Sequence, residues 1–241
     1  MINLIIKKYL RISNSFFKYC FYFIKNYRLI KNSKSFSQEG EDLFLIDFFK
    51  NQNRGFYVDV GAFHPFRINN TYALYKKGFR GINIDISVTS IDLFNFARPD
   101  DINLNLGASN KIEKKIFFSK KNLSFHNTFS KSLAESEIQN EPFKKRYTIE
   151  CKTLTKIIDE TKFFNKKIDF LNIDAEGHDF EVLEGLDLKK YSPKIICIEI
   201  STLIDDKNKN IQDTQIYKYL SKNSYELNWK GFNSFIFVLK K

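Results

Sequence analysis

Apolar segments alternate with helical segments from residue 39 to the end of the chain, and this order constrains the fold most strongly. Five short apolar segments predict buried strands, at 55–60, 81–86, 101–106, 168–173 and 194–200. Apolar residues at helical spacing predict helices at 39–51, 71–77, 88–97, 178–184 and 211–222. Continuous apolar strands separated by helices are typical of a parallel sheet that helices cover on both faces.

The chain ends with two further apolar segments, 225–229 and 234–239, which four residues separate. This pattern predicts a hairpin at the edge of the sheet. We therefore expect an α/β fold with a doubly wound, mostly parallel sheet and an antiparallel C-terminal hairpin. Ligands of such sheets bind at the carboxyl ends of the strands, where the strand order reverses.

Two segments depart from the alternation. Residues 107–152 hold a predicted strand, 115–119, and a predicted helix near 130–139; an insertion of this length is usually a lid or a substrate-binding element. Residues 1–38 hold eight Lys and Arg and no acidic residue, so the net charge of +11 leaves only +3 for residues 39–241. We therefore divide the chain into a basic N-terminal arm, 1–38, and a domain, 39–241, that contains the insertion.

The arm carries apolar residues at helical spacing over 2–30, which predicts an amphipathic helix. Its longest uncharged runs are six residues, at 12–17 and 19–24, and a membrane span needs about 20. Two interpretations remain open. The aromatic face packs on the domain or on a second subunit of a homodimer, or the helix lies on an anionic membrane surface.

The cysteine pattern bears on the compartment. The chain has three cysteines and no CxxC pair, so a disulfide framework and a zinc ribbon are both excluded as interpretations. A reducing compartment fits this pattern best. We therefore expect a cytoplasmic protein, at the inner face of the membrane if the arm binds lipid.

The ends of the first two predicted strands indicate the kind of ligand. A dinucleotide site would need GxGxxG after the first strand, whereas Gly61 is followed by Phe63, His64 and Pro65. Asp85 ends the second strand, where a carboxylate can take both hydroxyls of a ribose. A ribose site without a pyrophosphate site suggests S-adenosylmethionine. The alternative is structural, with Asp59 capping a helix and Asp85 only ending a strand.

Acidic residues and a histidine follow the fourth predicted strand. Asp174, Glu176 and Asp179 lie within six residues at a strand-to-helix turn, where helix capping alone explains Asp179 equally well. Asp174 can orient the substrate or a cation, or hold His178. Near a helix N-terminus the ring of His178 stays neutral and can act as a base. The alternative is a surface or supporting histidine. The other two histidines, His64 and His126, also lie outside the predicted strands.

Several motifs resemble the FkbM family of S-adenosylmethionine-dependent methyltransferases, in collinear order over about residues 36–200. They are Ser37-Gln38-Glu39-Gly40-Glu41-Asp42-Leu43, the strand end at 57–65, the block at 70–85, Asn127-Thr128-Phe129-Ser130, and Ile173-Asp174-Ala175-Glu176-Gly177-His178-Asp179. Two positions differ from the family pattern. Ile86-Ser87 replaces a frequent Ala-Asn, and Asp179 replaces a frequent Glu.

The resemblance implies a class I, Rossmann-like methyltransferase fold and O-methylation of sugars or polyketide-like products. We expect methylation of a sugar hydroxyl in a surface glycan or its precursor, as part of polysaccharide biosynthesis. The expected cofactor residues are Glu41, Asp59, Gly61, Thr71, Asp85 and Ser109. The expected acceptor residues are His64, Asn127, Thr128 and Glu176. The expected catalytic residues are His178, Asp174 and His126. Related enzymes suggest a divalent metal such as Mg²⁺, held by Asp174 and Glu199.

Two other functions are alternatives to this one. The charge of +11 suggests a nucleic-acid methyltransferase, but most of that charge lies in the arm and no RNA-binding motif is present, so we expect no nucleic-acid partner. A non-catalytic, membrane-associated scaffold is the other alternative. The presence of Gly61, Asp85, Asp174 and His178 argues against it.

The separate composition of the arm leads to a prediction. A chain that begins near Ser33 should remain soluble and bind the cofactor, because the predicted sheet begins only near Phe56. Light scattering and calorimetry check this, and aggregation or the loss of a dimer would show that the arm packs as core or interface. Flotation of the full chain with anionic vesicles tests the lipid interpretation, which an absence of binding at low salt would reject.

Overall fold

The computed structural model describes residues 33–119, 145–200 and 210–240, together with residues 16, 17, 20, 21 and 24 of the arm. These five arm residues are helical, and Phe16 packs edge-on against Phe96 with ring centroids 6.0 Å apart. The rest of the predicted arm helix and the predicted helix near 130–139 lie outside the described residues. None of the helices in the described part combines the length and the hydropathy that a membrane span requires.

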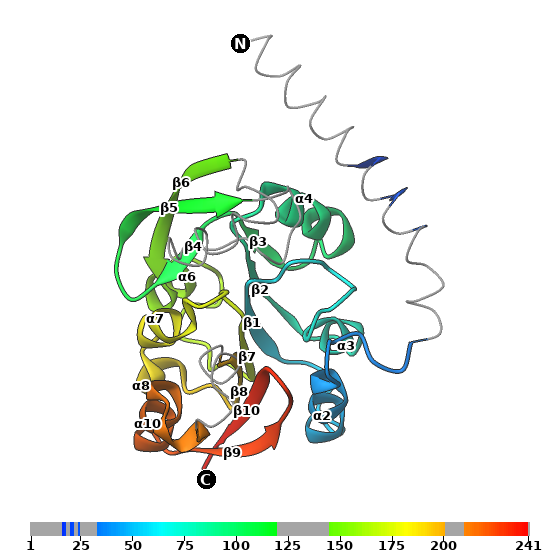
Figure 1. Ribbon diagram of the computed structural model, residues 1–241. Coiled ribbons are helices and arrows are strands. Elements are labelled where there is room, and N and C mark those ends of the chain that lie inside the picture. The colour runs from blue at the N-terminus through cyan, green and yellow to red at the C-terminus, as the bar shows by residue number, and fades with distance from the viewer. Residues whose placement is uncertain are drawn as a thin grey trace.

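A seven-stranded sheet forms the centre of the domain (Figure 1). Its strands are β1 (Phe56–Val60), β2 (Arg80–Ile84), β3 (Ile102–Leu104), β7 (Phe170–Ile173), β8 (Ile195–Glu199), β9 (Tyr225–Lys230) and β10 (Ser234–Leu239). Their order is β3-β2-β1-β7-β8-β10-β9, and β10 runs antiparallel to β8 and β9 while the other pairs are parallel. The predicted doubly wound class I arrangement with an antiparallel hairpin is thus confirmed.

Helices cover both faces of this sheet, as Figure 1 shows. They are α2 (Glu41–Phe48), α3 (Tyr72–Lys76), α4 (Val88–Ala97), α6 (Leu154–Asp159), α7 (Asp179–Glu184), α8 (Leu188–Tyr191) and α10 (Gln215–Lys222), with a 3-10 turn, η2 (Ile211–Asp213), before α10. Alternate residues of β1 point to opposite faces. Val58 joins the core with α6, α7, α8 and α10, and Tyr57 joins the core with α2 and α3.

The predicted insertion contains a small second sheet. Its strands are β4 (Gly107–Ser109), β5 (Glu113–Ser119) and β6 (Lys145–Thr153), in the order β4-β6-β5. The predicted strand 115–119 lies within β5, whereas β4 and β6 were not predicted. The helix α7 packs against β4, so this sheet lies beside the end of β7.

Gly61 permits the close approach of the ends of β1 and β7. Its φ is +74°, and a Cβ at this position would lie 1.7 Å from the carbonyl oxygen of Asp174. The amide of Gly61 donates to the carbonyl of Ile84 at 3.0 Å, which ties the same point to the end of β2. Any side chain at position 61 would therefore separate three strand ends.

Candidate active site

A cavity of about 660 Å³ lies at the carboxyl ends of β1, β2, β7 and β8. The strand order reverses between β1 and β7, which is where open α/β sheets bind ligands. Residues before α2 and residues at the start of β10, among them Gln38 and Asn233, complete the wall. The volume suits a small molecule, since such sites commonly measure about 300–1,000 Å³.

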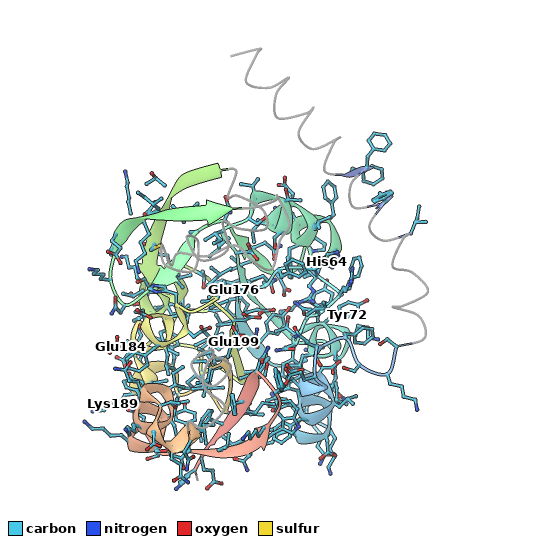
Figure 2. All side chains as sticks on the ribbon, viewed as in Figure 1. His64, Tyr72, Glu176, Glu184, Lys189 and Glu199 are labelled. Carbon is cyan, nitrogen blue, oxygen red and sulfur yellow. The ribbon has the colours of Figure 1, made fainter. Side chains whose placement is uncertain are left out.

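The structure brings seven of the predicted site residues to this cavity: Glu41, Asp59, Gly61, Asp85, Asp174, Glu176 and Glu199. In Figure 2, Glu176 and Glu199 lie near the centre of the molecule. Four other predicted residues do not line the cavity: His64, Thr71, Ser109 and His178. The remaining three, His126, Asn127 and Thr128, lie outside the described residues.

Asp85 is held by two backbone amides directly after β2. One carboxylate oxygen accepts from the N–H of Phe63 at 2.8 Å, and the other accepts from the N–H of Ser87 at 2.7 Å. Burial raises the pKa of Asp85 to about 6, while these two N–H groups act in the opposite direction. Each oxygen of a carboxylate can accept more than one hydrogen bond. Asp85 is therefore fixed in place and can still accept hydrogen bonds from a ligand in the cavity.

Asp59 lies on β1 and is almost completely buried, with three side-chain donors around it. Thr71 donates at 2.7 Å and Asn69 at 3.2 Å to one carboxylate oxygen, and Asn172 donates to the other at 2.9 Å. Burial raises the pKa of Asp59, and the hydrogen bonds from Thr71 and Asn172 oppose that rise. Thr71 precedes α3 and reaches the cavity only through Asp59, so the structure assigns it a supporting position rather than a place in the wall.

Asp174 directly follows β7, and Glu199 is the last residue of β8. Their carboxyl groups share a hydrogen bond. The pKa of Asp174 is raised well above its ordinary value by its enclosure in the domain and by Glu199 beside it, although the side chain opens onto the cavity. Burial and the negative charge of Asp179 raise the pKa of Glu199 to about 7. Among the described residues, no group of three or more His, Cys, Asp or Glu side chains is placed to bind a metal ion.

His178 lies directly before α7 and is turned away from the cavity. Its Nε2 lies 3.1 Å from the Oγ of Ser109 and 2.8 Å from the Nζ of Lys115, and its Nδ1 lies 3.4 Å from a carboxylate oxygen of Glu181. Burial lowers the pKa of His178, which favours the neutral ring. Ser109, on β4, is likewise occupied with His178 rather than with the cavity.

The turn between β7 and α7 explains why Asp174 and His178 separate. Glu176 and Gly177 both have positive φ, +51° and +86°, and reverse the chain between the two residues. Asp179 stabilises this turn by accepting from the N–H groups of Ala175 at 2.7 Å and Gly177 at 3.1 Å. Asp179 thus holds the turn that precedes α7 rather than capping the helix, whose N-cap residue is His178.

The segment before α2 is tied to two other parts of the cavity wall. Asp42 accepts from Ser35, Ser37 and the N–H of Phe36, at 2.6 to 2.8 Å. The carboxylate of Glu39 accepts from the N–H groups of Phe232 and Asn233 in the β9–β10 turn. These contacts hold Gln38 and Glu41 in the cavity wall. They give a structural role to Ser37, Glu39 and Asp42 of the Ser37–Leu43 motif.

Sequence reasoning missed four amides that line the cavity. They belong to Asn69, Asn70, Asn172 and Asn233. Asn172 had a visible signal, because it is a polar residue inside an otherwise apolar strand, β7. The Oδ1 atom of Asn233 is buried and accepts no hydrogen bond from the described part of the chain.

The comparison with protein families decides the identity. The model of the Methyltransferase FkbM domain matches residues 59–227 of the 241-residue chain. The chain belongs to the FkbM methyltransferase family. The predicted enzyme class, an S-adenosylmethionine-dependent methyltransferase, is thereby confirmed. The match begins at Asp59, so the Ser37–Leu43 motif precedes it, and it extends through α10 into β9.

Among solved structures, this chain is similar to an O-methyltransferase from Bacillus cereus, determined in complex with SAH. The two share 14% sequence identity, with 92% of this chain and 91% of that chain covered and a TM-score of 0.44. No curated protein gives a significant match. The family assignment therefore stands on the domain match and on the topology.

The position of His178 leads to a prediction. We expect His178→Ala to lower the free energy of unfolding by about 2 kcal/mol, because the buried hydroxyl of Ser109 and the half-buried ammonium of Lys115 lose a hydrogen-bond partner. Turnover should fall by less than about tenfold, since loss of a true general base costs about 10²-fold or more. Urea unfolding and methyl-transfer assays measure the two effects. A loss of turnover beyond 10²-fold at unchanged stability would show that His178 reaches the substrate after all.

Proposed function

We propose that this methyltransferase moves the methyl group of S-adenosylmethionine to a hydroxyl group of a sugar, in a surface glycan or its precursor. The observation that carries the proposal is Asp85. It stands at the end of β2 with both oxygens fixed by backbone amides and opens into a cavity of suitable size. A protein of this kind would act in polysaccharide biosynthesis in the cytoplasm.

The residues of the cavity fit the cofactor. Asp85 would accept the ribose hydroxyls, with the apolar side chains of Phe63 and Ile86 beside it in the wall. Glu41 and Asp59 add two more carboxylates to the cavity wall, which would attract the positive charges of the methionine end. When bound, S-adenosylmethionine supplies an electrophilic methyl group.

Other side chains of the cavity suit an acceptor with several hydroxyl groups. Asn70 and Asn233 offer amides and Glu176 a carboxylate, and the buried Oδ1 of Asn233 accepts nothing from the described residues. The amide of Asn172 supports them, since it donates to Asp59 and accepts from Asn70, each at 2.9 Å. A polar site built to bind hydroxyls discriminates strongly against ligands that lack them. Asp174 and Glu199 both line this space and share a hydrogen bond, which holds one proton between their two carboxyl groups. We assign this pair to orient the acceptor hydroxyl and to receive its proton on the ionised carboxylate.

An assay with unmethylated glycans tests the acceptor. The full chain, supplied with S-adenosylmethionine carrying a labelled methyl group, should form a methyl ether on a free, nucleotide-linked or polymeric sugar. Mass spectrometry of the released sugars locates the label. If the Asp174–Glu199 pair receives the proton, the double variant Asp174→Asn/Glu199→Gln should slow the transfer by about 10²-fold or more. Label transfer to RNA, with none to any sugar, would contradict the proposal.

Calorimetry with SAH tests the cofactor site separately from the acceptor. Asp85→Ala should weaken binding by about 2 kcal/mol or more, because two charge-assisted hydrogen bonds are lost. The ionised carboxylate is the hydrogen-bond acceptor, so affinity should be full above the pKa of about 6 and fall as the pH drops below it.

The matched control for this measurement is Asp100→Ala. Asp100 is an exposed aspartate that pairs with Arg80 at 3.1 Å outside the cavity, and its removal should leave SAH affinity unchanged. Equal affinities of the Asp85→Ala variant and the unaltered protein would remove Asp85 from the cofactor site.

A further inference from the structure

Arg98 is a completely buried arginine that the proposed reaction does not use. It follows α4 directly, and its exposed fraction is 0%. The guanidinium lies over the rings of Tyr72, Tyr75 and Phe94, 5.0 to 5.4 Å from their centroids. Burial of a charged group is costly, and an apolar side chain would fill the same space without that cost. The presence of a charge here therefore calls for a function.

The two Nη atoms of Arg98 bind mainly the loop between β1 and α3; Nη1 also lies 3.4 Å from the hydroxyl of Tyr57 on β1, and Nε donates to none of the described residues. Nη1 donates to the hydroxyl oxygen of Thr71 at 2.8 Å. Nη2 donates to the Oδ1 atom of Asn69 at 2.7 Å and to the carbonyl of Pro65. Phe63, Ile68, Asn69 and Asn70 in this loop line the cavity, whereas Arg98 itself does not. One guanidinium thus holds three points of a loop that forms part of the wall.

Because Arg98 can only donate hydrogen bonds, it determines the direction of the hydrogen bonds between its partners, Asn69 and Thr71, and Asp59. A guanidinium only donates, so the groups that it contacts must accept. Asn69 presents its Oδ1 to Arg98, and its Nδ2 therefore faces Asp59. Thr71 accepts from Arg98 on its oxygen, and its own proton is left to donate to Asp59 at 2.7 Å. Both donors reach the same oxygen of Asp59.

We propose that Arg98 is a positioning residue for cofactor binding: it orients Thr71 and Asn69 so that Asp59 acts only as a hydrogen-bond acceptor toward the cavity. This inference rests on the proposed function, because it assigns Asp59 to the positively charged end of S-adenosylmethionine. In this arrangement Asp59 remains a carboxylate with a fixed orientation. Loss of Arg98 leaves the hydroxyl of Thr71 able to turn toward the Oδ1 atom of Asn69, 2.9 Å away, so that Asp59 loses its closest donor. Asn69 itself is also held by the N–H of Thr71 and the carbonyl of Ala62.

A double-mutant cycle on SAH affinity separates this role from simple structural support. Arg98→Met should weaken SAH binding by about tenfold or more, since small displacements of positioning groups are costly. In the Asp59→Asn background the same substitution should have little further effect, because residues that act through one another are not additive. A merely structural arginine would give independent effects in the cycle.

A second pair of variants keeps the test valid if Arg98→Met does not fold. Thr71→Val removes the hydroxyl between Arg98 and Asp59 and should weaken SAH binding about tenfold, whereas Thr71→Ser keeps the hydroxyl and should bind SAH like the unaltered protein. The control is Arg80→Lys. Arg80 also lies over Tyr75, at 4.4 Å, and donates to backbone carbonyls, but it has no link to the cavity.

The outcomes distinguish the two proposals. Full SAH affinity in Thr71→Val, or additive effects of Arg98→Met and Asp59→Asn, would overturn the role of Arg98. Absence of SAH binding by the unaltered full chain would instead contradict the proposed function itself. Weak binding by Arg98→Met and Thr71→Val, with full binding by Thr71→Ser and Arg80→Lys, is the result that we expect.

Discussion

The parallel pairing of β1 with both β2 and β7 brings the candidate functional residues to one edge of the sheet. Residues 60, 84 and 173 are register partners across these three strands, so the residues that follow them leave the sheet at the same level. Gly61 makes this possible, because its missing side chain lets the carbonyl of Asp174 approach. Without that approach Asp85 and Asp174 would not share a cavity.

Carboxyl groups dominate the polar chemistry at this edge. Burial raises the pKa values of Asp59, Asp85, Asp174 and Glu199, and it opposes their ionisation. Backbone amides compensate at Asp85, and neutral side-chain donors compensate at Asp59. A cofactor that brings positive charge supplies the counterpart that these groups favour.

Much of the fold could be predicted from the sequence, because continuous apolar strands and helical spacing leave few alternatives. The predicted helix 88–97 has the bounds of α4, and the five predicted parallel strands all exist. β6 was missed although its apolar residues alternate with polar ones, because it lies in a segment that was interpreted as an insertion. α8 was missed because four residues are too few to show a helical period.

The site was harder to predict than the fold, because the spacing of residues along the sequence does not say in which direction their side chains point. Asp85 and Asp174 were found since they end buried strands. His178 was misplaced relative to Asp174, because two consecutive residues with positive φ turn the chain between them. Arg98 had no signal in the sequence, where a basic residue after a helix predicts an exposed partner for the helix dipole.

The most direct test of this account is a crystal structure of the full chain with SAH. The account predicts that SAH occupies the cavity at the carboxyl ends of β1, β2 and β7. The ribose hydroxyls should lie about 3 Å from the carboxylate of Asp85, within hydrogen-bond distance. SAH bound elsewhere on the domain, or bound in the cavity with its ribose away from Asp85, would contradict it.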